Sequence, residues 1–223
     1  MLFRSVTKTL SEAIRTPKPV DFVEQRVQRG TGDATAVALG AFPEETGLDE
    51  DDVLVLVGDV PLLRADTVAA LVAHHRESDA AATLLTTHVD DPTGYGRIVR
   101  DARGGVARIV EQADATEEER AITEVNPAIG CYRRSLLAPA LRRLTPANAQ
   151  GELYLTDAVR DLADPAVAGR QPIRVEGHVQ TGLSVAATGL QVRIGQVAGQ
   201  VQRQTLARRR RRHNLFRLIL HLS

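Results

Sequence analysis

Five apolar residues in succession, Val53 to Val57, end at Gly58-Asp59 and precede Val60-Pro61. Three of the five are β-branched, so the run predicts a strand buried inside a sheet. Ligands of open α/β sheets bind outside the carboxyl ends of the strands. Asp59 stands at such an end and is a candidate oxygen ligand for Mg²⁺ held against phosphate oxygens. The alternative is that Asp59 only caps the helix that follows.

Strands and helices alternate along the sequence, which predicts an α/β fold whose sheet is covered by helices on both faces. A hairpin expected at 97–100 and 106–111, turning at Gly104-Gly105, makes this sheet mixed, with most strands parallel. The other strands are expected at 21–25, 53–57, 80–89, 125–132 and 172–179. The helices are expected at 31–42, 65–77, 116–121, 135–144 and 152–162.

The composition fits one domain in a reducing compartment. The 223 residues suffice for a substantial core, and because aromatic residues make up only 3%, Ala, Val and Leu must supply most of it. The single cysteine, Cys131, excludes an internal disulfide and is expected to be a buried thiol. No signal peptide or membrane-spanning stretch is recognised, so we expect a cytoplasmic protein.

The formal net charge is zero, but the charge is unevenly distributed. Residues 181–223 contain eight arginines, five of them consecutive at 208–212, and no acidic residue. Such a run could bind nucleic acid or anionic lipid, or form a solvated tail. The sudden loss of acids favours a third interpretation, in which the segment is not a native reading frame. We therefore expect neither nucleic acid nor membrane among the partners.

Several further motifs occur in a fixed order around Gly58-Asp59. They are Gln25, Gly30-Thr31-Gly32-Asp33-Ala34, the 91–98 segment DPTGYGRI, Ile109-Val110-Glu111, Glu124-Val125-Asn126 and the 148–157 segment NAQGELYLTD. This ordered set resembles the uridyltransferase half of the bacterial bifunctional enzyme that makes UDP-N-acetylglucosamine. The resemblance covers residues 20–180, and DPTGYGRI and NAQGELYLTD are its most specific parts.

The resemblance implies a nucleotide-diphospho-sugar transferase fold, which is Rossmann-like, and an activity. That activity is transfer of UMP from UTP to N-acetylglucosamine 1-phosphate, with release of pyrophosphate, for peptidoglycan precursor synthesis. It assigns no catalytic side chain. The substrate-binding residues that it implies are Gln25, Gly30 and Thr31 for uridine, Gly58 and Asp59 beside the phosphates, and Gly96, Glu111 and Asn126 for the sugar. Asp59 is the implied Mg²⁺ ligand.

Taken without the resemblance, the same residues have simpler interpretations. Gly30 could belong to an ordinary strand-to-helix turn, Gly96 to a hairpin turn, and Glu111 could be an exposed charge at a strand end. Tyr154 and Asp157 are spaced i, i+3 on the helix expected at 152–162, and we interpret them as mainly structural. The adjacent histidines at 74 and 75 point to different faces of their helix, so we expect solvent exposure and no shared metal ion.

The chain also departs from the family pattern. The glycine-rich phosphate loop, its lysine and the first strand are not recognised before Gln25, and no Val-Asn follows Glu176-Gly177 to supply a second metal ligand. Pro127-Ala128 follows Asn126 where the family has a small residue and a glycine. The trimerising hexapeptide-repeat half is absent too, so we expect a monomer.

We therefore expect three parts: a poorly defined segment 1–20, a partial nucleotidyltransferase domain 21–180 that is incomplete at its N-terminus, and an Arg-rich tail 181–223. We expect this chain to be an impaired fragment with little activity. Two alternatives stay open. One is a non-catalytic chain that binds the sugar nucleotide, and the other is a uridyltransferase for another hexose 1-phosphate.

Overall fold

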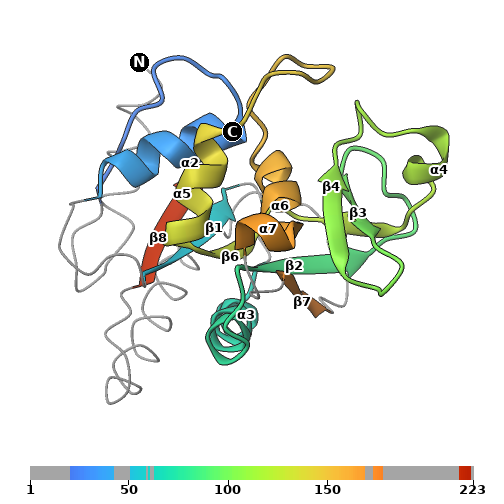
Figure 1. Cartoon of the computed structure of the whole chain (residues 1–223), viewed down its shortest axis with the longest axis horizontal. Helices are drawn as coiled ribbons and strands as arrows, with labels where there is room; N and C mark the ends of the chain where they lie inside the picture. The colour runs from blue at the N-terminus through green and yellow to red at the C-terminus, as the bar shows by residue number, and fades with distance from the viewer. Residues whose placement is uncertain are drawn as a thin grey trace.

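The computed structural model describes residues 21–42, 51–58, 60, 63–168, 173–177 and 216–221. Its strands form an eight-stranded sheet in the order β4-β3-β5-β2-β6-β1-β8, and β7 pairs with the remaining edge of β2 (Figure 1). The strands are β1 (Asp52–Val57), β2 (Ala82–His88), β3 (Gly96–Arg100), β4 (Val106–Val110), β5 (Glu124–Asn126), β6 (Gly130–Arg133), β7 (Ile173–Gly177) and β8 (Phe216–His221).

The expected α/β class is confirmed, because helices cover both faces of a mixed sheet. The strand directions differ from the expectation. Only β1 with β8 and β2 with β7 pair in parallel among the described strands, and the other pairs are antiparallel. The cause is β6, which runs antiparallel between β1 and β2 and so separates two strands that follow one another in the sequence.

The position of β1 in the sheet explains why its sequence is apolar without interruption. Val53 and Val55 belong to the core on one face of the sheet, whereas Leu54 and Leu56 belong to the core on the other face. All four are nearly inaccessible to solvent. A strand buried on both faces needs apolar residues at every position instead of the alternation seen at a solvent-facing sheet.

Helices supply the two layers that cover the sheet. The helices are α2 (Thr31–Gly40), α3 (Ala65–Glu77), α4 (Glu117–Arg120), α5 (Arg134–Arg142), α6 (Leu155–Ala163) and α7 (Pro165–Ala168). In Figure 1, α3 lies on the opposite side of the sheet from α2, α5 and α6. α6 buries Leu155, Ala158, Val159 and Leu162, an i, i+3, i+4, i+7 stripe typical of a core-facing helix.

His75 corrects the expectation of two exposed histidines. It continues the buried stripe of α3, after Leu71 and Val72, and is 1% exposed. Its Nδ1 lies 2.9 Å from Thr83 Oγ1, and its Nε2 lies 3.4 Å from Asp52 Oδ1. A buried polar ring needs such partners, and the sequence does not reveal them because they come from β2 and β1.

The predicted strand 125–132 is interrupted, and β5 and β6 are its two parts. Asn126 Oδ1 accepts a hydrogen bond from Ala128 N (3.1 Å) in the turn between them. Ala128 has a φ of 57°, in the left-handed region that disfavours residues other than glycine. The turn lets β5 pair with β3 while β6 pairs with β1.

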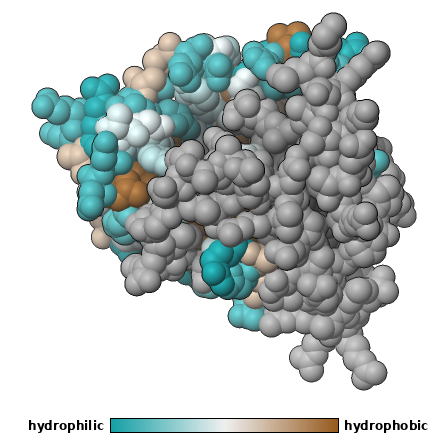
Figure 2. All heavy atoms as spheres, turned by 180° about the vertical axis from the view of Figure 1, so that it is seen from behind, coloured by the Kyte–Doolittle hydropathy of each residue, from teal (hydrophilic) through white to brown (hydrophobic). Residues whose placement is uncertain are grey.

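Both ends of the described chain differ from expectation. Residues 21–25 form no strand. Phe216–His221, which fall within the segment expected as a tail, form β8 and pair along the whole length of β1. On the face seen in Figure 2, hydrophobic side chains of the described residues occur singly among polar ones.

Candidate functional site

The predicted sugar-binding residues come from three paired strands. Gly96, at the start of β3, lies opposite Asn126 at the end of β5. β3 also pairs with β4, so Gly96 lies beside Glu111, which directly follows β4. A Cβ atom at Gly96 would lie 3.0 Å from Ile109 Cγ2 and 3.3 Å from Glu111 Oε2. The structure therefore brings Gly96, Glu111 and Asn126 together, and a glycine leaves room for the Glu111 carboxylate.

Glu111 is a half-buried carboxylate in an acidic neighbourhood. Thr156 Oγ1 donates a hydrogen bond of 2.7 Å to Glu111 Oε1. Loss of hydration raises the pKa of Glu111, and the charges of Asp157 and Asp114 raise it further, against the opposing effects of Thr156 and Arg97. A carboxylate held this way is ready to accept hydrogen bonds from a ligand, because a ligand donor would relieve its poor solvation.

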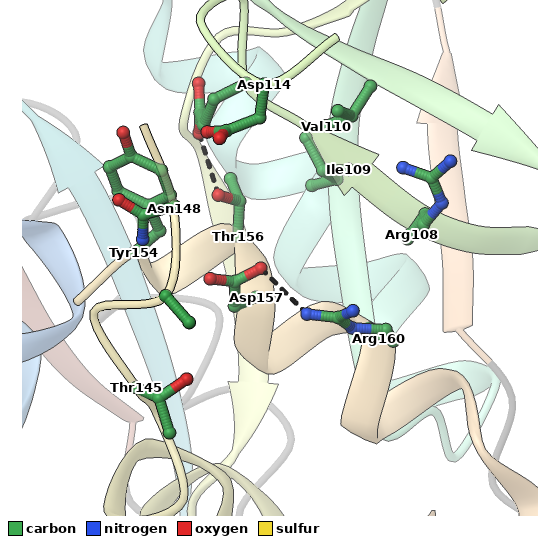
Figure 3. A pocket seen from close by; sticks show the side chains of 12 residues that line it. Arg108, Ile109, Val110, Asp114, Thr145, Asn148, Tyr154, Thr156, Asp157 and Arg160 are labelled. Atoms are coloured by element: carbon green, nitrogen blue, oxygen red, sulfur yellow. Dashed lines mark hydrogen bonds and ion pairs between the residues drawn. The ribbon is translucent and has the colours of Figure 1, made fainter. Parts of the chain in front are cut away.

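A polar cavity of about 370 Å³ lies next to Glu111. Its polar lining comes from Arg108, Glu111, Asp114, Thr145, Asn148, Tyr154, Thr156, Asp157 and Arg160 (Figure 3). In the figure the two arginines lie on one side, and Asp114, Asn148 and Tyr154 lie on the other. The volume is in the range of small-molecule sites, and many donors and acceptors suit a hydroxylated ligand. Gly96 and Asn126 do not line this cavity.

The predicted uridine-binding turn packs against another motif. Gly32 N donates to Leu153 O (2.8 Å), and Leu153 N donates to Arg29 O (2.7 Å). A Cβ atom at Gly30 would lie 2.6 Å from Leu153 O, and Gly30 has a φ of 106°. The glycine is therefore required by the approach of Leu153 and by its own backbone conformation.

Thr31 and Gln25 make specific polar contacts at this turn. Thr31 Oγ1 accepts a hydrogen bond from Leu155 N (3.0 Å), at the first residue of α6. Gln25 Nε2 donates to Asp33 Oδ2 (2.7 Å) and to Gly30 O (3.2 Å). These contacts hold Gln25 at the N-terminal end of α2.

One short segment links the two predicted binding regions. Leu155 N bonds to Thr31 at the predicted uridine end, and the next residue, Thr156, bonds to Glu111 at the predicted sugar end. Asn148 Oδ1 accepts from Glu152 N (3.1 Å), which fastens the loop before this segment. The loop also explains why α6 begins at Leu155 and not at 152 as expected.

The predicted metal ligand cannot be placed with the others. Gly58 is buried at the carboxyl end of β1, but Asp59 lies outside the described residues. Among the residues that the structure describes, no three His, Cys, Asp or Glu side chains lie together as a metal-binding group. Nor does any helix in the described part have the length and apolar character needed to cross a membrane.

Sequence reasoning did not single out Asp33 or Thr156. Both lie inside motifs that carry the resemblance, so their position within those motifs is the signal that could have identified them. Tyr154 and Asp157, interpreted as mainly structural, make structural contacts: Tyr154 Oη donates to Gln150 Oε1 (2.5 Å), and Asp157 pairs with Arg160 (3.1 Å). Both also line the cavity.

Curated proteins similar to this chain include three bifunctional GlmU proteins. Bifunctional protein GlmU of Mycolicibacterium gilvum is 44% identical over 194 residues, which are 87% of this chain and 37% of that protein. GlmU of Mycobacterium avium is 44% identical over 191 residues, 85% and 37% of the two chains. GlmU of Mycolicibacterium vanbaalenii is 54% identical over 143 residues, 64% and 28%. The resemblance inferred from the motifs is confirmed, and the matched part of the chain spans 28–37% of the length of these relatives.

Solved structures and a family model agree with this result. The crystal structure of UDP-glucose pyrophosphorylase complexed with UDP-glucose superimposes with a TM-score of 0.54 at 13% identity, over 83% of this chain and 66% of that one. The apo form of UDP-glucose pyrophosphorylase gives a TM-score of 0.53 at 15% identity, over 84% and 64%. Identities this low show the fold alone. The family model described as Nucleotidyl transferase matches residues 4–169, so the chain belongs to the nucleotidyl transferase family.

Proposed function

We propose that this chain binds UTP and N-acetylglucosamine 1-phosphate and transfers the uridylyl group between them, at a low rate because its phosphate loop and the lysine of that loop are not recognised in the sequence. A phosphate oxygen of the sugar phosphate attacks the α-phosphorus of UTP. The bond from that phosphorus to the oxygen bridging the α- and β-phosphates breaks, and the products are UDP-N-acetylglucosamine and pyrophosphate. Positioning two substrates supplies much of the catalysis in such a reaction.

The observation that carries this proposal is the link through Leu155 and Thr156. These neighbouring residues bond to Thr31 and to Glu111, which the resemblance assigns to uridine and to the sugar. A uridine and a sugar bound at these two places would be positioned relative to each other by the segment that contains Leu155 and Thr156. Gln25 and Gly30 extend the uridine end, and Gly96 and Asn126 lie with Glu111 at the sugar end.

Nucleotidyl transferases usually use a divalent metal ion, and Mg²⁺ bound by Asp59 is our specific proposal. Asp59 follows Gly58 at the carboxyl end of β1, where a hard oxygen ligand suits a hard cation. When bound, the ion offsets negative charge on the phosphates as pyrophosphate leaves.

The test separates binding from transfer. Pyrophosphate release is measured with UTP, N-acetylglucosamine 1-phosphate and Mg²⁺, and affinity for UDP-N-acetylglucosamine is measured by calorimetry. Release above background supports the uridyltransferase. Binding without release supports the alternative of a non-catalytic sugar-nucleotide-binding chain, and faster release with glucose 1-phosphate supports a different hexose.

Glu111→Gln tests the sugar end. Hydrogen bonds to a charged acceptor contribute about 1.5–3 kcal/mol, so we expect affinity for UDP-N-acetylglucosamine to fall about 10- to 100-fold. Glu118→Gln, which removes an exposed carboxylate on α4, is the matched control and should bind like the wild type. Equal affinity of the Glu111 variant and the wild type would contradict the assignment of Glu111 to the sugar.

A further inference from the structure

The side-chain amide of Gln25 is held in one orientation. Its nitrogen donates to Asp33 Oδ2 at 2.7 Å and to the carbonyl oxygen of Gly30 at 3.2 Å. Asp33 lies in the first turn of α2, is 7% exposed, and is fixed in turn by Arg29, whose Nη2 donates to the other carboxylate oxygen at 2.7 Å. The partner atoms on the nitrogen side of the amide are therefore both oxygens.

Asp33 acts in this contact only as an acceptor. Burial by itself would raise the pKa of Asp33, but the hydrogen bonds from Gln25 and Arg29 and the charge of Arg29 together lower that pKa below its usual value. The positive end of the α2 dipole favours the same ionised state. An ionised carboxylate has no proton to donate, and neither does a backbone carbonyl.

The orientation of the amide follows from its partners. If the amide were flipped, its oxygen would face the Asp33 carboxylate and the Gly30 carbonyl, and two hydrogen bonds would become two repulsive contacts. The Gln25 nitrogen therefore faces the protein, and the atom left for a ligand is the oxygen Oε1. No donor in the described part of the chain bonds to this oxygen.

We propose that Asp33 is a positioning residue that makes this site selective for uracil over cytosine. The inference rests on the proposed function, in which Gln25 faces the base of the nucleotide. Uracil carries an N–H at ring position 3 and can donate to Oε1. Cytosine has an unprotonated nitrogen there, so two acceptors would face each other. Sites built around one hydrogen bond reject analogues that cannot make it, because a polar group stays unpaired.

Asp33→Asn is the direct test. An asparagine can present either an oxygen or an NH₂ group to Gln25, so a flip that turns the Gln25 NH₂ towards the base is then opposed by the Gly30 carbonyl alone instead of by two acceptors. Affinities for UTP and CTP are measured by calorimetry with Mg²⁺. We expect the ratio of the two affinities to fall at least tenfold in the variant. A purely structural role of Asp33 would weaken both nucleotides equally and leave the ratio unchanged.

Asp66→Asn is the matched control. Asp66 also lies in the first turn of a helix, α3, and also pairs with a nearby arginine, Arg64 at 2.8 Å, but it is exposed. The UTP-to-CTP ratio of this variant should equal that of the wild type. A fall in the control as large as that in the Asp33 variant would overturn the assignment.

A second measurement needs no variant and so stands even if Asp33→Asn fails to fold. The triphosphate of 3-methyluridine has a methyl group in place of the N3 hydrogen, and the wild-type chain should bind it at least tenfold more weakly than UTP. Equal binding of UTP and either CTP or the methylated nucleotide would refute the proposed selectivity. Failure to bind UTP at all would overturn the proposed function as well. Binding of UTP without selectivity would overturn only the role of Asp33, so the two proposals can fail separately.

Discussion

Among the glycines whose surroundings the structure describes, Gly30 has the closest backbone contact, and Gly30→Ala should be severely destabilising. With φ 106° and ψ 174°, Gly30 occupies a region that is almost exclusive to glycine, and forcing another residue into it costs about 1–3 kcal/mol. The new Cβ would also lie 2.6 Å from Leu153 O and 2.9 Å from Leu153 N, both backbone atoms. Overpacking of this kind adds about 1–3 kcal/mol. We therefore expect a loss of about 3 kcal/mol or more in the free energy of unfolding.

Two other glycines separate these contributions. Gly151 has a φ of 68°, but a Cβ atom added there would meet nothing within 4 Å, so Gly151→Ala should cost only about 1–2 kcal/mol. Gly40 is helical and equally unobstructed, so Gly40→Ala should stabilise the protein by about 0.5 kcal/mol. Urea unfolding of the three variants measures all three values. If Gly30→Ala were no less stable than Gly151→Ala, the packing of Leu153 on the turn would be refuted.

Three other variants have defined outcomes. Ala128→Gly should raise the free energy of unfolding by about 1 kcal/mol in urea unfolding, because Ala128 has a φ of 57°; no change would argue against strain at this turn. Burial raises the pKa of Glu111, so the folded state favours the protonated form of this side chain. The stabilisation that the protonated form gives the folded state is present at acidic pH and is lost as the pH rises through the pKa of Glu111 in the folded protein. Glu111→Gln should therefore be more stable than the wild type at pH 7 but not at pH 4, and parallel pH profiles would contradict this. Glu124 accepts two hydrogen bonds from Arg100 (2.8 and 2.7 Å) and one from the buried Thr86 hydroxyl (2.9 Å), and Glu124→Ala should cost about 2 kcal/mol in thermal or urea unfolding, because the buried hydroxyl loses its acceptor whereas the exposed guanidinium keeps Gly104 O and solvent; a loss below about 0.5 kcal/mol would be inconsistent with these contacts.

The elements that the sequence predicts best are those whose signal is local. The apolar run of β1 and the stripe of α3 lie in the structure where the pattern places them. Strand directions were harder to predict, because they depend on which segment inserts between β1 and β2. Nothing local in the sequence of β6 indicates that it does so. His75 shows the same limit, since its burial depends on Asp52 and Thr83 from other elements.

The candidate site likewise contains residues that local motifs could predict and residues that they could not. Glu111, Gly96 and Asn126 could be grouped from motifs because each lies at the end of a strand. The roles of Gly30 and Thr156 could not be derived, since both depend on how the loop before α6 approaches the start of α2 and the end of β4. That approach is a tertiary contact between segments far apart in the sequence.

The position of β8 in the sheet affects how this protein folds during its synthesis. β1 is translated early, whereas the strand that pairs with its outer edge is translated near the end of the described chain. At about 5–20 residues per second, the ribosome needs on the order of ten seconds to travel from one strand to the other. During that interval β1 presents apolar side chains and an unpaired row of backbone groups, which can pair with strands of other nascent chains. We therefore expect the yield of native protein to depend on chaperone capacity and on the rate of translation more than on the stability of the finished fold.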